Sequence, residues 1–168
     1  MRMQTRVSAA ILTAVLLGAG ALPAAAQKSA DTLRIVMRDA LPNIDPYYNN
    51  LRTGVVMHHQ GWDALVYRNP DTFKLEPLLA TEWKLPDATT IEFTLRPGVR
   101  FHDGSAFTAD DAVFSIERAL AVPSQRAFQL KGVTAVKKID ALTIELQLAQ
   151  PDAVIPEKTQ YIAMMSKA

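Results

Sequence analysis

The chain has 168 residues, 49% of them hydrophobic, so it is long enough for one domain with a buried core. Its 18 basic and 17 acidic residues nearly cancel, and it has no aromatic-rich basic patch, so no nucleic-acid partner is expected. Cysteine is absent, which excludes disulfides, cysteine-ligated metals and the lipid-modified N-terminal cysteine of a lipoprotein.

The first 26 residues have the pattern of a secretory signal peptide. Arg2 and Arg6 precede an apolar run over residues 7–22, and Ala24-Ala25-Ala26 follows as a cleavage motif. The alternative, a membrane anchor, needs about 20 apolar residues, more than this run has. We therefore expect secretion by the general route, cleavage after Ala26 and release into a Gram-negative periplasm.

The next stretch is predicted to contain a strand, a loop and a helix. Alternating apolar residues favour a strand over residues 32–37. A turn at Asp45-Pro46 leads into a polar loop that is rich in amide side chains. Apolar residues at helical spacing then predict a helix within residues 55–62, which leads to an extended run at residues 65–67.

The strongest local signals lie between residues 90 and 121. Ile91, Phe93 and Leu95 alternate with polar residues, so residues 90–101 are predicted to be extended, with one buried face and a turn at Pro97-Gly98. These residues are expected to belong to a mixed or antiparallel sheet.

A helix and a β-hairpin are predicted to complete this sheet layer. Thr108 has the position of a helix N-cap, with Asp111 three residues later as in a capping box, and the helix is expected to run to Ala121. Two alternating runs within residues 133–148 are separated by a short turn at Asp140-Ala141, which predicts a hairpin. The helix is expected to pack on the sheet.

Several motifs resemble one family of transport proteins. The run LRPGVRFHDG at residues 95–104 and the run TADDAVFS at residues 108–115 closely resemble the signature of the family 5 extracellular solute-binding proteins. Ile44-Asp45-Pro46 is similar to the family's LDP segment, and residues 75–83 are similar to its P-x-LA-x-x-W element. These proteins are the peptide/nickel-type substrate-binding subunits of ABC importers.

The resemblance implies an α/β fold with a mixed, α+β-like sheet and packed helices, as in the N-terminal part of a type II periplasmic-binding-protein two-lobe fold. It divides the chain into a signal peptide (1–26), the opening segment of the first lobe (27–68) and a small domain packed on that lobe (69–168). Family members are longer, so the remainder of the first lobe and the whole second lobe are expected to be missing, as in a fragment or a truncated gene product.

The resemblance also places the amide-rich loop beside the ligand cleft. The candidate ligand-binding residues are Asn49, Asn50, Leu51, Arg52 and Thr53. Residues 126–129 are expected to approach the cleft from the small domain. For Arg52, pairing with a ligand carboxylate and simple solvation at the surface both remain open.

Other polar and aromatic residues are interpreted as structural. Asp103 is expected to build a turn, and Asp110-Asp111 to cap a helix, because no nucleophile and base accompany them. His58-His59 are adjacent on a helix and should point to different faces, so they are not expected to chelate a metal, although the family includes nickel binders. The aromatic residues Trp62, Trp83, Tyr67 and Phe93 are expected in the core.

We therefore expect a periplasmic substrate-binding component without enzymatic activity, catalytic residues, metal or cofactor. Its expected partners are a peptide or another small solute, and the ABC permease and ATPase complex at the inner membrane. The alternatives are a non-binding truncated remnant and, less favoured, a secreted hydrolase. Residues 27–168 alone are expected to bind no peptide measurably, because a cleft protein gains affinity by enclosing its ligand. The identity of the ligand stays open.

Overall fold

The computed structural model describes residues 34–121 and 123–168, so the predicted signal peptide and its cleavage site lie outside the described residues. The chain divides into two units, Met1–Val36 and Met37–Ala168, and only residues 34–36 of the first unit are among the described residues. The described residues of the first unit have exposed side chains and no regular structure. The strand predicted over residues 32–37 is therefore wrong for residues 34–37, which are described but form no strand, and the side chains of Ile35 and Val36 are exposed.

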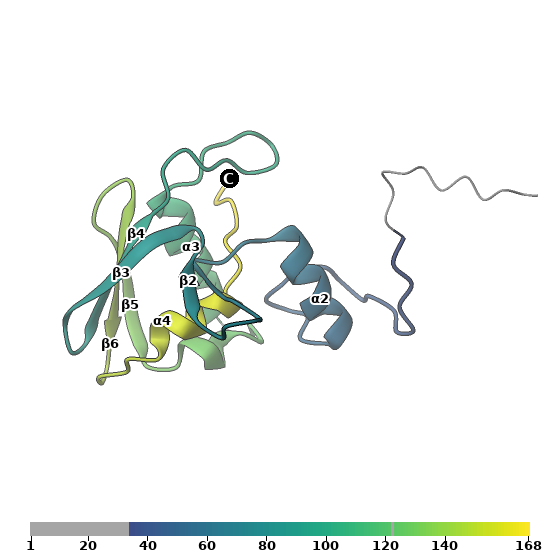
Figure 1. The fold of residues 1–168 in the computed structure, drawn as a ribbon, viewed down its shortest axis with the longest axis horizontal. Coiled ribbons are helices and arrows are strands. Elements are labelled where there is room, and N and C mark those ends of the chain that lie inside the picture. Colours follow the sequence, from purple (N-terminus) through teal and green to yellow (C-terminus); the bar gives the residue numbers. More distant parts are fainter. Residues whose placement is uncertain (1–33, 122) are drawn as a thin grey trace, which may run out of the picture. The chain divides into compact units, whose positions relative to one another are not determined.

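The second unit contains a four-stranded antiparallel sheet (Figure 1). Its strands, in chain order, are β3 (Ala80–Asp87), β4 (Thr90–Leu95), β5 (Val133–Lys138) and β6 (Thr143–Leu148). In space the order is β3-β4-β6-β5, and every neighbouring pair is antiparallel. The predicted hairpin at residues 133–148 is confirmed as β5 and β6.

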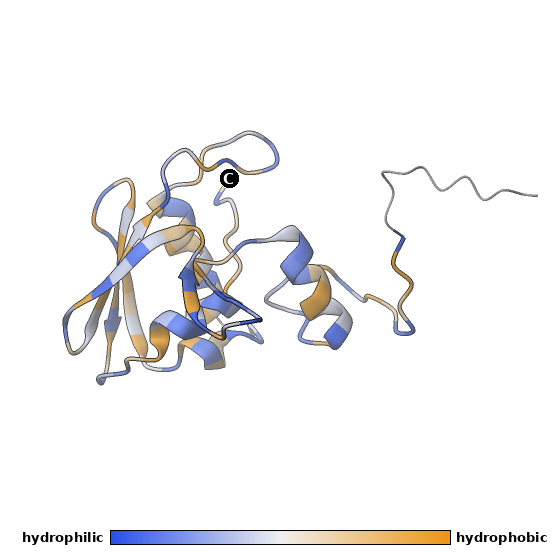
Figure 2. Ribbon diagram, viewed as in Figure 1, coloured by the Kyte–Doolittle hydropathy of each residue, from blue (hydrophilic) through white to orange (hydrophobic). Residues whose placement is uncertain are grey.

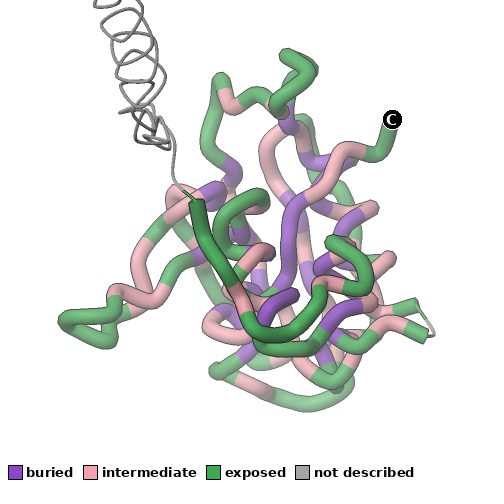
Figure 3. The backbone as a smooth tube through the Cα atoms, turned by 90° about the vertical axis from the view of Figure 1, so that its right-hand side faces the viewer, coloured by how far each residue is buried: buried purple, intermediate pink, exposed green. Residues whose placement is uncertain are grey.

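One face of this sheet builds the hydrophobic core. Ile91, Phe93 and Leu95 of β4 are fully buried, as their alternation predicts. In the β4–β6 register, Ile91 faces Leu146 and Phe93 faces Ile144, and these partners are also fully buried. Figure 2 shows hydrophobic and hydrophilic residues interspersed along the strands, and Figure 3 shows buried positions recurring along the trace.

The predicted turn at Pro97-Gly98 is confirmed, whereas the strand expected to resume beyond it as far as residue 101 is wrong. Strand β4 ends at Leu95, before this turn, in which Gly98 has a φ of 75°. Beyond the turn, Arg100 makes only an isolated bridge with Ala106. Residues 99–107 therefore form a loop of their own beside the sheet.

Helix α3 (Ala109–Leu120) packs on the sheet at β5 and β6, as predicted. Its buried apolar side is made of small and medium side chains, Ala112, Ile116 and Ala119. The capping box is also confirmed: the Asp111 carboxylate accepts hydrogen bonds from the Thr108 backbone N–H (2.9 Å) and from the Thr108 hydroxyl (2.8 Å).

The remaining elements are short. They are α2 (Arg52–Gly61), the hairpin of β1 (Val66–Arg68) and β2 (Leu75–Pro77), the 3-10 helices η1 (Ala127–Leu130) and η2 (Thr159–Tyr161), and α4 (Ile155–Lys158). Among the described residues, no helix has the length and apolar character needed to cross a membrane. The architecture is an α/β arrangement with antiparallel sheets, in agreement with the predicted fold class.

Three of the four aromatic residues predicted in the core pack there. Phe93 is fully buried, and Trp62 and Trp83 are partly buried against the core. The prediction is wrong for Tyr67, which is 43% exposed. Val66, its neighbour in β1, is buried. Because successive side chains of a strand point to opposite faces, Tyr67 points away from the core.

Candidate functional site

The candidate segment, residues 49–53, leads into the first turn of α2 and has buried and exposed members. Asn49 and Thr53 are buried, whereas Asn50, Leu51 and Arg52 are exposed. The Asn49 amide donates to the Asn43 carbonyl (2.7 Å) and accepts from the Leu51 backbone N–H (3.2 Å). Asn49 therefore shapes the turn, and the groups that face solvent belong to its neighbours.

The second predicted stretch, residues 126–129, begins where the chain meets the candidate segment. The Asn50 backbone N–H donates to Gln125 Oε1 (2.9 Å), and Arg126 Nη1 donates to Asn50 Oδ1 (2.9 Å). Arg126 Nε also donates to the Pro46 carbonyl (3.0 Å), and the Gln125 backbone N–H donates to the Tyr47 carbonyl (2.7 Å). Two regions about 75 residues apart in sequence thus form one hydrogen-bonded unit.

The charge of Arg126 is not balanced within the described part of the chain. Its side chain is 4% exposed, no ion pair with a carboxylate is formed there, and Nη2 has no hydrogen-bond partner among those residues. Burial lowers the pKa of Arg126, and the nearby Tyr161 opposes this effect in part. A buried cation without a counter-charge is unfavourable unless an anion reaches it.

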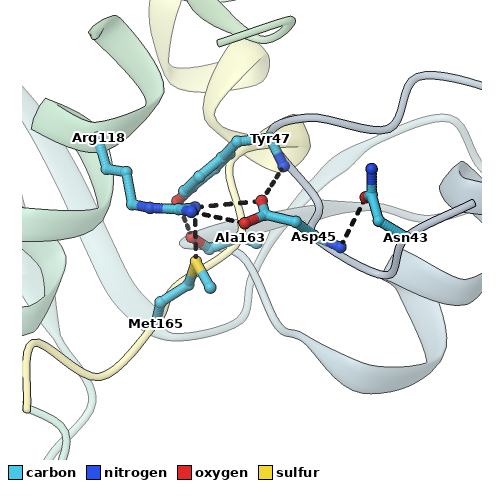
Figure 4. Close-up of polar contacts among 6 residues, drawn as sticks. All are labelled: Asn43, Asp45, Tyr47, Arg118, Ala163 and Met165. Atoms are coloured by element: carbon cyan, nitrogen blue, oxygen red, sulfur yellow. Dashed lines mark hydrogen bonds and ion pairs between the residues drawn. The ribbon is translucent and has the colours of Figure 1, made fainter. Parts of the chain in front are cut away.

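An ion pair fixes the start of this region from α3 (Figure 4). The Arg118 guanidinium donates to both Asp45 carboxylate oxygens (3.2 and 2.5 Å). It lies 4.9 and 5.1 Å from the ring centroids of Tyr47 and Tyr48. Burial alone would raise the pKa of Asp45, but Arg118 and the Tyr47 backbone N–H hold it below its usual value. The predicted turn at Asp45-Pro46 is therefore anchored by a residue that local sequence patterns did not indicate.

The two adjacent histidines differ in burial, but their rings stack. His58 is 2% exposed and His59 is exposed, yet the ring centroids lie 4.9 Å apart with an interplanar angle of 6°. The expectation that they point to different faces is therefore wrong for the rings. Burial, together with the nearby His59 and Arg126, lowers the pKa of His58 to about 4, and His58 Nδ1 has no hydrogen-bond partner among the described residues.

The acidic residues of the signature motifs are engaged in local structure. Asp103 Oδ1 accepts hydrogen bonds from the Ser105 backbone N–H (2.8 Å) and hydroxyl (2.7 Å), which closes a turn. Asp110 pairs with Lys138 (2.5 Å), and Asp111 closes the capping box. Within residues 34–121 and 123–168, no three or more His, Asp or Glu side chains gather as a metal site would require.

One cavity adjoins the candidate segment. It has a volume of about 410 Å³ and is lined by Met37, Arg38, Asp39, Arg52, Thr53 and Val56. Cavities of about 420 and 570 Å³ lie elsewhere in the unit, and none of residues 49–53 lines them. Arg52, which the sequence predicts to bind ligand, is exposed and is one of the residues that line the cavity of about 410 Å³.

Comparison with known proteins gives a consistent result. Residues 74–168 match the family model described as "Bacterial extracellular solute-binding proteins, family 5 Middle". Among curated proteins, the HTH-type transcriptional regulator SgrR of Pectobacterium atrosepticum is 29% identical over 124 residues, which are 74% of this chain but 22% of that protein.

Solved structures of similar fold are also longer than this chain. The murein tripeptide binding protein MppA of Escherichia coli superposes with a TM-score of 0.67 at 24% identity, over 77% of this chain and 30% of that chain. DppA from Helicobacter pylori, solved with the peptide STSA, gives 0.62 at 25% identity, over 74% and 28%. NikZ from Campylobacter jejuni, solved with Ni(L-His), gives 0.65 at 23% identity, over 77% and 26%.

Proposed function

The chain belongs to the bacterial extracellular solute-binding proteins of family 5, and on this premise we propose that it binds peptides or similar small solutes for an ABC importer. Two of the similar structures support this class of solute: DppA was solved with a peptide, and MppA is named as a murein tripeptide binding protein. We further propose a periplasmic location, reached through the N-terminal signal peptide, and partnership with an ABC permease and ATPase.

The observation that carries this proposal is the contact between the two stretches predicted to border the cleft. Asn50 joins them through Gln125 and Arg126, so both stretches can face one ligand. Leu51 and Arg52 remain exposed beside this junction, and Arg52 also lines the adjoining cavity. Candidate ligand contacts are therefore the backbone of residues 49–53 and the side chains of Asn50, Leu51 and Arg52, while Asn49 shapes the turn and Thr53 is buried in the lining of the cavity.

The charge of this region favours a solute with a carboxylate. Arg126 is a buried cation without a counter-charge among the described residues, and Arg52 adds an exposed cation beside the cavity. A guanidinium binds a carboxylate through parallel N–H···O bonds, which suits the carboxyl end of a peptide. The proposed action is binding alone: the solute shifts the protein towards the conformation for which it has the higher affinity, and no bond is made or broken.

An NMR titration tests this function. We expect tens of millimolar trialanine to shift the backbone amides of residues 50–53 and the Arg126 Nε–H. The Kd should be at or above about 1 mM, too weak to be measured at micromolar peptide, because the chain aligns with less than a third of the longer solute-binding proteins. Trialanine with an amidated C-terminus should produce smaller shifts. Arg52→Met should weaken the effect, whereas Arg96→Met, which removes another exposed arginine, should leave it unchanged.

Other outcomes would contradict specific parts of the proposal. Shifts confined to residues outside 49–53 and 124–130 would place the site elsewhere. Equal shifts with the free acid and the amide would remove the role of the carboxylate. No shift even at peptide concentrations far above about 1 mM would favour a chain without binding activity. Calorimetry with micromolar peptide is expected to show no saturable heat for residues 27–168.

A further inference from the structure

Tyr47 connects three separate parts of the second unit. Its backbone N–H donates to the Asp45 carboxylate (2.9 Å), and its backbone carbonyl accepts from the Gln125 N–H (2.7 Å). Its side chain is fully buried, and the hydroxyl donates to the Ala163 carbonyl across 116 positions of sequence. Figure 4 shows the Tyr47 side chain among Asp45, Arg118 and Ala163.

The C-terminal segment, residues 163–167, is held on two sides. The Met164 backbone N–H donates to the Asp63 carbonyl (2.9 Å). Two later backbone N–H groups donate to side chains of α3. The Met165 N–H donates to Ser115 Oγ (2.8 Å), and the Lys167 N–H donates to Asp111 Oδ1 (3.0 Å). Alternate backbone groups of an extended chain face opposite sides, so this segment is clamped between the residue 63 connection and α3.

Tyr47 completes this clamp and also sets the candidate segment. Burial raises the pKa of its hydroxyl, so the group remains a hydrogen-bond donor at physiological pH. Removing the hydroxyl would leave the buried Ala163 carbonyl without this donor. Any shift of the Tyr47 backbone would pass through Gln125 to Asn50, since both residues are bonded to Gln125.

We propose that Tyr47 is a positioning residue that couples the candidate segment, residues 49–53, to the C-terminal segment, residues 163–167. Stabilising one segment then stabilises the other, because coupling between two sites is reciprocal. The use of this coupling in solute binding rests on the proposed function, whereas the coupling itself requires no ligand. A solute that orders residues 50–52 would thereby fix the path of the chain at residue 167.

Amide hydrogen exchange of the 168-residue chain tests the coupling without a ligand. Tyr47→Phe removes one hydroxyl and should accelerate exchange roughly 2- to 10-fold at Met164, Met165 and Lys167, the fold-change that corresponds to one lost hydrogen bond. It should also accelerate exchange at the amides of residues 50 and 51, which do not contact the hydroxyl. The matched control, Tyr67→Phe, removes the hydroxyl of a half-exposed tyrosine and should change neither segment.

A second variant approaches the coupling from the other end. Ser115→Ala removes the acceptor of the Met165 N–H and should also accelerate exchange at residues 50 and 51. The two substitutions together should accelerate it less than the product of their separate effects, because both release the same clamp. Ser115→Ala alone decides the question if Tyr47→Phe does not fold.

Two results would overturn the proposal. Acceleration confined to residues 164–167 in both variants would mean that each bond acts only locally. Uniform acceleration, including the hairpin amide of Ile139 and the strand amide of Leu148, would mean that Tyr47 stabilises the whole fold without selective coupling. Because no ligand enters the experiment, either result leaves the trialanine titration as a separate test of function.

Discussion

The buried histidine of α2 should make the fold sensitive to mild acid. The pKa of His58 is lowered from 6.5 to about 4 by burial and by the nearby His59 and Arg126. The unfolded chain therefore binds a proton at His58 at a pH where the folded chain does not, so acid favours unfolding. The free energy of unfolding is therefore highest above about pH 6.5, where His58 is neutral in both states, and it decreases as the pH falls towards 4.

The size of this effect follows from the two pKa values. Between pH 8 and pH 5 the free energy of unfolding should fall by about 2 kcal/mol, which is an upper limit because His58 also lines an open cavity that admits water. Urea midpoints measured across this range would record the change. Carboxyl groups with lowered pKa values, such as Asp45, titrate below this range and do not obscure it.

Two variants isolate the contribution of His58. His58→Gln cannot be protonated and should lose most of the slope between pH 7.5 and pH 5, even if its stability at neutral pH is lower. His59→Gln changes the exposed neighbour and should keep most of the slope. If His58→Gln and the parent show the same slope in this range, burial of a neutral imidazole is not the cause of the acid sensitivity.

Three further predictions concern stability, each measured by urea unfolding at neutral pH. Thr108→Ala should cost about 1 kcal/mol by removing one of the hydrogen bonds to Asp111, and unchanged midpoints would mean that the hydroxyl contributes nothing to the cap. Gly54→Ala should lower the free energy of unfolding by about 1–3 kcal/mol, since the new Cβ would lie 2.4 Å from Asn49 Cγ. A higher free energy of unfolding would show that the Asn49 amide moves aside freely. Asp45→Asn should cost about 1–3 kcal/mol by leaving its arginine partner half-buried without a counter-charge, and a neutral effect would mean that solvent replaces the pair.

Local sequence patterns predicted the elements whose signals are local. The alternation around Phe93 and the capping box at Thr108 depend on neighbouring residues, and both β4 and α3 formed where expected. Strand β3 was not predicted as a continuous strand, because Pro86 and adjacent exposed residues interrupt its alternation. It forms through pairing with β4, in which register shifts accommodate the irregular positions.

The polar contacts of the candidate site could not be predicted in the same way. The pairing of Arg118 with Asp45 and the contact of Arg126 with Asn50 join residues more than 70 positions apart. Sequence spacing along one element carries no signal for such pairs, and an arginine in a helix is usually solvated. The family resemblance indicated that residues 49–53 and 126–129 belong together, but the structure was needed to identify the bonds between them.

The bond from Tyr47 to Ala163 also bears on the order in which the chain folds during synthesis. The β4–α3–hairpin region can form once residue 148 has emerged, whereas the opening segment must wait for a partner 116 positions later. Contacts of such long sequence separation form late, because closing the intervening loop costs entropy before the contact stabilises it. The N-terminal part of the second unit should therefore remain open to proteases and chaperones until Ala163 has emerged.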